Sequence, residues 1–242
     1  MNYQEVLFKD IGTVRYKEAW DYQERLLQEN VAVKTALREA QDKGETSGAE
    51  YQTSNHLLFV EHPHVYTLGK SGHMDNVLLS EEHLVKRGID FFRINRGGDI
   101  TYHGPGQIVG YPIFDLERFY TDIGRYLRNI EEVVIRTLSG YGLKGERSPG
   151  ETGVWLDPFV RGRERKICAI GVRTSRWITM HGFALNVNTD LDYFGFIIPC
   201  GIQNKQVTSL QKELGREVDM EGVKQQLKTH FEDVFEIRLR YQ

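Results

Sequence analysis

The stretch that decides the fold is IDFFRINRGGDITYHGPGQIVGYPIFDL, residues 89–116. Its two ends, residues 89–95 and 107–114, are rich in β-branched and aromatic side chains, which indicates two strands. The segment between them, residues 96–106, contains four glycines. Glycines at this density let backbone N–H groups face a ligand, although a hairpin with a tight Gly-Gly-Asp turn is the simpler alternative. Within this segment, Thr101, Tyr102 and His103 favour a loop that binds a ligand. The segment matches neither a Walker A loop nor a dinucleotide-binding fingerprint.

Helical and strand-like segments are intermingled on both sides of this stretch. Apolar residues at helical spacing predict helices over residues 16–42, 122–139 and 221–235, and Ser80 is placed to cap a short helix that ends at Arg87. Further strands are predicted at residues 56–60, 153–156, 166–173 and 178–188, with a hairpin tip at 157–165 and a loop at 43–50. No repeat, linker or regular βαβ order is present, so we expect one mixed α/β domain over residues 1–242.

Composition narrows the class of protein. The 242 residues suffice for one large domain without disulfides. A net charge of −3 excludes a surface that binds nucleic acid throughout, but not a local basic patch. No apolar run approaches the ~20 residues that span a bilayer, and the first ten residues lack a signal-peptide core. His62 and His64 lack the partners of a metal site. We therefore expect a cytoplasmic enzyme or binding protein.

The two cysteines, Cys168 and Cys200, are too few for a disulfide framework or a four-thiolate zinc site. Each is either a buried packing residue or a reactive thiol. A proline and a glycine flank Cys200, which places it on a loop or at a strand end. An ordinary thiol is only slightly ionised at neutral pH, so a nucleophilic cysteine requires a neighbouring base or cation. The candidates are Lys166, His103 and His181.

Lys166 lies among apolar residues in RKICAIG, residues 165–171. On a regular strand Lys166, Cys168 and Ile170 would share one face. Such a lysine is either an exposed charge at the strand end or a partly desolvated amine that acts as a base. Cys168 on the same strand is more simply a packing residue. The basic run at residues 161–166 is either a solvated turn or a docking patch for an acidic partner.

Four separated motifs occur in a characteristic order: RGGDITYHGPGQ at 96–107, KICAIG at 166–171, HGFALNVN at 181–188 and IPCG at 198–201. Together they closely resemble the lipoyl(octanoyl) transferases, enzymes of protein lipoylation. The resemblance runs from about residue 57 to 210 and implies a biotin/lipoate protein ligase-like catalytic fold. That fold is an α/β domain of the α+β type, with a central mixed β-sheet flanked by helices.

The resemblance also implies a reaction. An octanoyl group moves from the phosphopantetheine thioester of acyl carrier protein to a lysine of a lipoyl domain, through a cysteine thioester and a Cys–Lys dyad. Carried over by motif, the nucleophile is Cys200 and its partner is Lys166. No cofactor or metal is implied, because the carrier protein holds the acyl donor. The implied substrate-binding residues are Arg96, Gly97, Gly98, Asp99, Ile100, Thr101, Tyr102, His103, Ala169, Ile170, Gly171, Gly182, Phe183 and Ala184.

The expected partners are acyl carrier protein and lipoyl domains, namely those of 2-oxoacid dehydrogenase acyltransferase subunits and the glycine cleavage H protein. Nucleic acid and membranes are not expected. The tip at residues 157–165 is longer than the compact turn expected in the family, which could change carrier-protein docking. Ala169 fits its motif but removes any side-chain hydroxyl at that position.

The chemistry of the residues agrees with this assignment. Thioester exchange needs no ATP, and Lys166 could accept first the thiol proton and later the proton of the acceptor amine. Backbone N–H groups near residues 166–171 or Cys200 are the expected oxyanion donors. The apolar residues expected to wall the acyl channel are Val109, Phe183 and Ile198.

Three rival interpretations stay open at this point. An ATP-dependent ligase of the same fold would leave Cys200 without a role, and residues 161–166 only superficially resemble the Gly-Arg loop of biotin ligases. A thiol hydrolase would pair Cys200 with His103 or His181. A binding module for lipoyl domains would need neither Cys200 nor Lys166.

Overall fold

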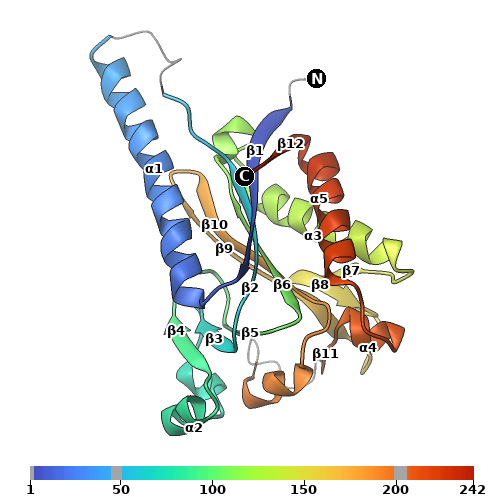
Figure 1. Cartoon of the computed structure of the whole chain (residues 1–242). Helices are drawn as coiled ribbons and strands as arrows, with labels where there is room; N and C mark the ends of the chain where they lie inside the picture. The colour runs from blue at the N-terminus through green and yellow to red at the C-terminus, as the bar shows by residue number, and fades with distance from the viewer. Residues whose placement is uncertain (1–2, 45–50, 199–205) are drawn as a thin grey trace.

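The computed structural model describes residues 3–44, 51–198 and 206–242. Cys200 lies outside the described residues, as does most of the loop expected at residues 43–50. Within the described ranges the chain forms a large mixed sheet, a small second sheet and helices on both faces of the large sheet (Figure 1). The expected α/β domain, with a central mixed sheet and flanking helices, is confirmed.

The large sheet has nine strands among the described residues, in the order β12-β1-β2-β6-β10-β9-β8-β7, with β11 paired to β9 outside this path. Strand β1 is parallel to β12 and to β2, and the path from β2 to β7 is antiparallel. The strands are β1 (Gln4–Thr13), β2 (His56–Glu61), β6 (Gln107–Ile113), β7 (Glu146–Ser148), β8 (Glu151–Leu156), β9 (Arg165–Ser175), β10 (Ile178–Asn186), β11 (Gln206–Val207) and β12 (Ile237–Tyr241).

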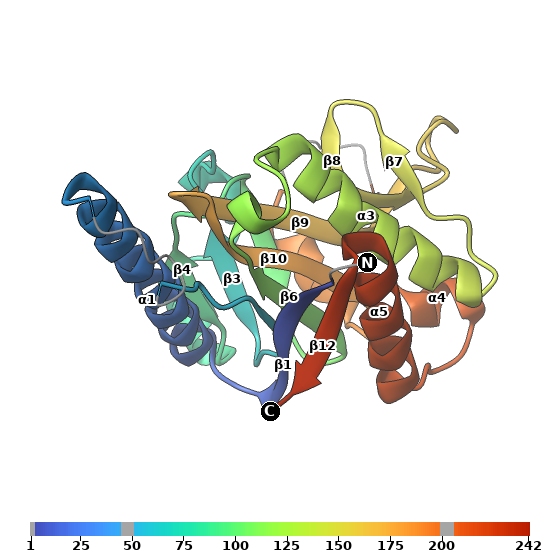
Figure 2. The ribbon, with the colours of Figure 1, turned by 90° about the horizontal axis from the view of Figure 1, so that it is seen from above.

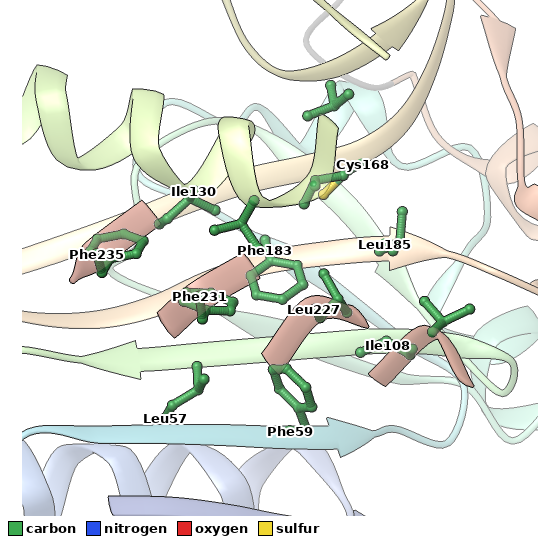
Figure 3. Packing of buried hydrophobic residues seen from close by; sticks show 14 of the residues in the cluster. Leu57, Phe59, Ile108, Ile130, Cys168, Phe183, Leu185, Leu227, Phe231 and Phe235 are labelled. Atoms are coloured by element: carbon green, nitrogen blue, oxygen red, sulfur yellow. The ribbon is translucent and has the colours of Figure 1, made fainter. Parts of the chain in front are cut away.

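Three long helices cover the two faces of this sheet. Helix α1 (Tyr16–Asp42) packs on one face, and α3 (Ile123–Gly140) and α5 (Met220–Phe235) pack on the other (Figure 2). The core beneath α3 and α5 includes Phe59, Phe183, Phe231 and Cys168, all with exposures of at most 2% (Figure 3). The core beneath α1 is smaller and includes Leu27, Val109 and Ala184.

A small sheet of order β4-β3-β5 stands beside the large one. Its strands are β3 (Val65–Leu68), β4 (Asp90–Arg93) and β5 (Ile100–His103). The remaining elements are short: the 3-10 helices η2 (Met74–Asn76), η3 (Leu116–Arg118) and η4 (Leu191–Phe196), and the α-helices α2 (Glu81–Lys86) and α4 (Leu210–Leu214). The Ser80 hydroxyl accepts from the His83 N–H, which confirms the predicted cap of α2.

The three predicted long helices and the hairpin at residues 157–165 are confirmed, but several strands were not predicted. Residues 100–103 were interpreted as part of a glycine-rich loop, and they form β5 instead. Four residues between two glycine runs are too few to show an alternating pattern, and β5 forms because β3 pairs with it antiparallel. Strands β1, β3 and β12 were missed for a similar reason, because charged residues or short length obscure their periodicity.

Strand β9 contains a bulge beside β8. Val154 pairs with Cys168, and the next residue of β8, Trp155, pairs with Lys166, so Ile167 is an extra residue on β9. A bulge interrupts the alternation of side chains along a strand. The prediction that Lys166 and Cys168 share one face is therefore wrong: Cys168 lies in the core with Val154, whereas the Lys166 ammonium lies over the Trp155 ring.

Candidate active site

A cavity of about 550 Å³, here called the main cavity, opens between β9 and the glycine-rich segment at residues 96–101. Lys166 lies in its wall. The residues expected to bind substrate that line it are Arg96, Gly97, Gly98, Asp99, Ile100, Thr101, Ala169, Ile170, Gly171 and Ala184. Three of the four motifs, which are distant in sequence, thus contribute to one site. The last three residues of the fourth motif, IPCG, lie outside the described ranges.

A smaller chamber of about 40 Å³, here called the inner chamber, continues the main cavity. The expected residues His103, Gly182 and Phe183 line this chamber and not the main cavity, and so does Val109. The walls of the two spaces share six residues: Arg96, Thr101, Ala169, Ile170, Gly171 and Ala184. The two spaces therefore adjoin each other at these six residues.

Two expected contributors lie elsewhere. Tyr102 lines neither space: its ring stacks on Tyr193 with centroids 5.0 Å apart, and its hydroxyl bonds His64 Nδ1 at 2.7 Å. Strand alternation explains this, because Thr101 and His103 point to the cavity side of β5 and Tyr102 to the other. Ile198, expected as a channel wall, is also absent from both linings.

Arg96 holds the glycine-rich segment in place. Its Nη2 donates to the carbonyls of Thr67 (3.0 Å) and Asp99 (2.8 Å), and its Nη1 donates to that of Gly97 (2.8 Å). Gly98 has φ +86°, a conformation that favours glycine. The Gly97 N–H donates to the Val172 carbonyl at 3.0 Å, which ties the segment to β9. The glycines therefore permit a tight backbone path that Arg96 fixes against the sheet.

Small residues on β9 and β10 create the space. Gly171 pairs with Gly182, and Ala169 pairs with Ala184 directly across the two strands. A Cβ on Gly171 would lie 2.7 Å from Arg96 Cδ, so a larger residue would displace the arginine. Two adjacent cross-strand pairs without bulky side chains leave a depression on the α1 side of the sheet. The motifs KICAIG and HGFALNVN thus supply a floor that an apolar chain can lie on.

Lys166 is half-buried at the wall of the main cavity. Its Nζ lies 4.6 Å from the centroid of the Trp155 ring, a cation–π contact. No carboxylate of the described residues forms an ion pair with this ammonium. Because the bulge at Ile167 turns it out of the core, the amine faces the same depression as Ala169 and Gly171.

Cys168 is fully buried beneath α3 (Figure 3). Burial raises the pKa of its thiol far above the ordinary value, so the thiolate is disfavoured. The sulfur is 3.6 Å from the Ala169 carbonyl. Cys168 is therefore a packing residue, as expected, and not a nucleophile.

Cys200 lies outside the described residues, and the described chain on either side of it is close to the main cavity. On the N-terminal side, the Ile198 N–H donates to the Asn76 carbonyl at 2.9 Å, and Phe194 lines the main cavity. On the C-terminal side, Val207 pairs with Lys166 and lines the same cavity. Phe194 and Val207, described residues on either side of the range 199–205, thus both line this cavity.

The two candidate histidine bases are buried away from Lys166. Burial lowers the pKa of His103 to about 3 and that of His181 to about 3, so both are neutral at physiological pH. The Nδ1 of His103 lies 2.8 Å from Gln107 Oε1, and His181 adopts φ +60°. Burial therefore disfavours the positively charged form of both imidazoles.

Several residues of the site were not recognised from the sequence. Ile123 and Leu127 of α3 line the main cavity, whereas their helical spacing indicates only that they share the apolar face of a helix. Gly150, Glu151 and Thr152 enter the cavity from the start of β8. The remaining unrecognised residues are Gln107, Val172, Asn186, Phe194 and Val207 in the main cavity, and Tyr16 and Tyr111 in the inner chamber.

The basic run at residues 161–166 divides into two parts. Arg165 is committed to ion pairs with Glu213 and Asp157, each at 2.6 Å. Arg161 and Arg163 are exposed at the tip, beside Phe159, which is 67% exposed.

Within the described residues, no group of three or more His, Cys, Asp or Glu side chains could hold a metal ion. Both nitrogens of His62 are engaged, with the Val14 carbonyl and the Tyr111 hydroxyl at 2.7 Å each. None of the described helices is both long enough and apolar enough to cross a bilayer.

Comparisons with known proteins agree with this geometry. The family model described as the lipoyl protein ligase A/B catalytic domain matches residues 15–232. An octanoyltransferase of Christiangramia forsetii is 59% identical, covering 99% of both chains. An octanoyltransferase of Flavobacterium johnsoniae is 56% identical, covering 98% of this chain and 99% of its own.

Solved structures share the fold at much lower identity. A chain from the structure of a bipartite lipoate protein ligase and its E2 lipoyl domain from Thermoplasma acidophilum has a TM-score of 0.66 and 20% identity, covering 100% of this chain and 87% of its own. A lipoate-protein ligase A bound with ATP has a TM-score of 0.66 and 18% identity, covering 100% and 89%. The sequence relatives and the match to the family model show that this chain belongs to the octanoyltransferases of the lipoyl protein ligase A/B catalytic-domain family, which are acyltransferases.

Proposed function

We propose that this enzyme transfers an octanoyl group from acyl carrier protein to a lysine of a lipoyl domain, through a thioester on Cys200. The observation that carries the proposal is the position of Lys166. The bulge in β9 places its amine at the wall of an apolar cavity, beside the strand pair through which the Cys200 segment returns. The sequence relatives of this chain are octanoyltransferases, which supports octanoyl as the acyl group.

Lys166 acts as the base in the first step. The Cys200 thiol gives its proton to the Lys166 amine, and the sulfur attacks the carbonyl carbon of the donor thioester. The carbon–sulfur bond to the carrier breaks, and the departing thiolate takes the proton back. One thioester replaces another, so the step is nearly balanced in energy and requires no ATP.

The second step reverses the roles. The acceptor lysine attacks the acyl-enzyme carbonyl, the bond to Cys200 breaks, and an amide forms. The attacking amine must lose a proton, which Lys166 accepts and passes to the cysteine thiolate. An arginine could not do this, because its guanidinium stays protonated in proteins.

The exposed edge of β9 offers an oxyanion donor. The Val172 carbonyl accepts from Gly97 on the side away from β10, and Cys168 pairs with β8 on that same side. Backbone groups two residues apart in a strand point the same way, so the N–H of Ile170, midway between them, also faces away from β10. Ile170 lines the main cavity, and its N–H is the donor we assign to the tetrahedral oxyanion.

The acyl chain lies along the depression above Ala169 and Gly171. With a rise of roughly 3.3 Å per residue and Ile167 taken up by the bulge, Ala169 and Gly171 lie roughly 7 Å and 13 Å from Lys166 along β9. Each methylene buried there contributes about 0.8 kcal/mol, so binding should strengthen with chain length until the depression is filled.

Intact-mass measurement tests the proposal. Incubation with octanoyl-acyl carrier protein without ATP should add one octanoyl group to the wild-type chain and to Cys168→Ala, and none to Cys200→Ala. The adduct should disappear when a lipoyl domain is added, and the lipoyl domain should gain the same mass. Octanoylation that depends on ATP and free octanoate would instead support the ligase interpretation, and the absence of any adduct would support a binding module.

A further inference from the structure

Helix α3 carries a fully buried carboxylate, that of Glu131, which no step of the proposed function uses. A charged group that is removed from water needs partners that replace its hydration. Its Oε2 accepts from Arg128 Nη1 at 2.7 Å and from Arg147 Nε at 3.0 Å. Its Oε1 accepts from the backbone N–H of Gly153 at 3.0 Å. The arginines therefore engage one oxygen, and the other holds the backbone of β8.

Gly153 lies directly against the lysine of the proposed mechanism. Its φ is +123°, a conformation that side chains other than glycine rarely adopt. A Cβ on Gly153 would lie 2.6 Å from the Cys168 carbonyl oxygen and 3.5 Å from Lys166 Cε. No larger residue fits between this part of β8 and β9. The backbone that Glu131 holds is therefore also the backbone on which the Lys166 side chain rests.

The bond from Glu131 acts on the same stretch of β8 as the bulge in β9. Ile167 is the extra residue of that bulge, and it places Lys166 and Cys168 on opposite sides of the strand. Regular pairing of β8 with β9 would restore the alternation and turn the amine toward the core. A slip of β8 would also pull the Gly153 N–H away from its acceptor, and a buried N–H without an acceptor is destabilising.

We propose that Glu131 is a positioning residue for the Lys166 amine: it fixes Gly153, and thereby the bulge that turns the amine into the main cavity. The catalytic consequence rests on the proposed function, in which Lys166 moves a proton. The role is geometric, because two arginines engage the charge of the carboxylate. A displacement of about 1 Å between reacting groups can lower a rate by about 100-fold.

The first test reads the position of the amine without measuring activity. The lysines are reductively methylated with ¹³C-formaldehyde, and the Lys166 signal is assigned by its absence in Lys166→Arg. The ammonium lies 4.6 Å from the Trp155 ring centroid, so this signal should be displaced from those of the other lysines by the ring current. Glu131→Gln should remove at least half of that displacement. An unchanged signal would overturn the proposal.

The adjacent glutamate provides a matched control. Glu132 pairs with Arg147 at 2.8 Å and with Arg136 at 3.0 Å. Glu132→Gln thus removes ion pairs from the same helix with the same chemical change, while the bond to Gly153 stays. The Lys166 signal should keep its position in this variant. Equal displacement in Glu131→Gln and Glu132→Gln would mean that loss of any ion pair on α3 moves the amine, which would also overturn the proposal.

The second test measures transfer from octanoyl-acyl carrier protein well below the melting temperature of each variant. Glu131→Gln should lower kcat by about tenfold to 100-fold and change KM by less than about twofold, because the amine moves and the cavity does not. Glu132→Gln should keep both values within about twofold of wild type. A normal kcat for folded Glu131→Gln would show that Glu131 serves stability alone and would refute the positioning role.

Glu131→Asp keeps both tests decisive if Glu131→Gln does not fold. It retains the charge for the arginines but withdraws the oxygen from Gly153 by one methylene, so it should show the same fall in kcat and the same signal change. Wild-type values in both measurements would overturn the proposal. A normal rate for Lys166→Ala would instead overturn the proposed function, and the signal change in the Glu131 variants would then still report the geometry.

Discussion

The two ends of the proposed substrate site are both polar, but in different ways. At one end the Lys166 amine faces the main cavity and contacts the π face of Trp155. At the other end the imidazoles of His103 and His181 are buried and neutral, with pKa values lowered to about 3 by that burial. Under the proposed mechanism, the difference means that the group that accepts and returns a proton lies at the open end of the site, whereas the buried end holds neutral hydrogen-bonding groups.

Loss of the Lys166 amine should have the largest effect. Lys166→Ala should lower octanoyl transfer by about 100-fold to 10,000-fold, the range of a general base. Its melting temperature should stay close to that of the wild type, because the side chain is only half-buried. Lys166→Arg keeps the charge and should be similarly slow. A normal rate for Lys166→Arg would show that the charge, and not proton transfer, is what this end of the site supplies.

Low pH should destabilise the folded state through the buried histidines. Burial lowers the pKa of His62 to about 4 and those of His103 and His181 to about 3, against about 6.5 in an unfolded chain. Between these values the unfolded state binds more protons, so stability is present above pH 6.5 and is lost as the pH falls. Each histidine should remove up to about 1.4 kcal/mol per pH unit, measured by urea unfolding between pH 7 and 5.

The variant His181→Asn separates this effect from that of carboxylates, because asparagine does not titrate and tolerates a positive φ. Its unfolding free energy should depend less steeply on pH than that of the wild type. An identical slope would mean that His181 is not held neutral by the fold.

The floor of the inner chamber should tolerate little added volume. A Cβ on Gly182 would lie 2.1 Å from the Gly110 carbonyl oxygen, so the backbones of β6 and β10 would have to separate. Gly182→Ala should lower the free energy of unfolding by about 1–3 kcal/mol. Gly195→Ala is the control, since its Cβ would meet nothing within 4 Å. Equal stability of the two variants would contradict this account of the floor.

The smallest effect is expected two residues from Lys166. Cys168→Ala removes a buried sulfur and should cost about 1 kcal/mol of unfolding free energy. Transfer should stay within about threefold of wild type, because the side chain faces the α3 side of β9. A loss comparable to that of Lys166→Ala would show that the two faces of β9 are not independent.

Sequence alone could predict which residues belong to the site, but not the directions in which their side chains point. The long helices, the hairpin at residues 157–165 and the position of Cys168 in the core follow from periodicity and composition. The bulge at Ile167 could not be predicted, because it arises from the pairing of β9 with β8. For the same reason a regular alternation misplaced Lys166 relative to Cys168.

The inner chamber was equally hidden. His103 and His181 were recognised as potential bases, yet their burial, neutrality and joint position depend on contacts across three elements. Tyr16 opens the longest helix and looks like an ordinary end residue, and it reaches the chamber only because α1 packs on the sheet. Tertiary packing, and not local preference, decides these roles.

The bulge has a consequence for how this family can vary. Leu156 pairs with Arg165 and Trp155 pairs with Lys166. The pairing of β8 with β9 next to the hairpin tip, and not the tip itself, therefore fixes the position of Lys166. Insertions or deletions in residues 158–164 would change only the hairpin tip, and the Lys166 amine would still face the main cavity. The tip is thus free to diversify for different protein partners, whereas loss of a single residue at position 167 would point the amine at the wrong side of the sheet.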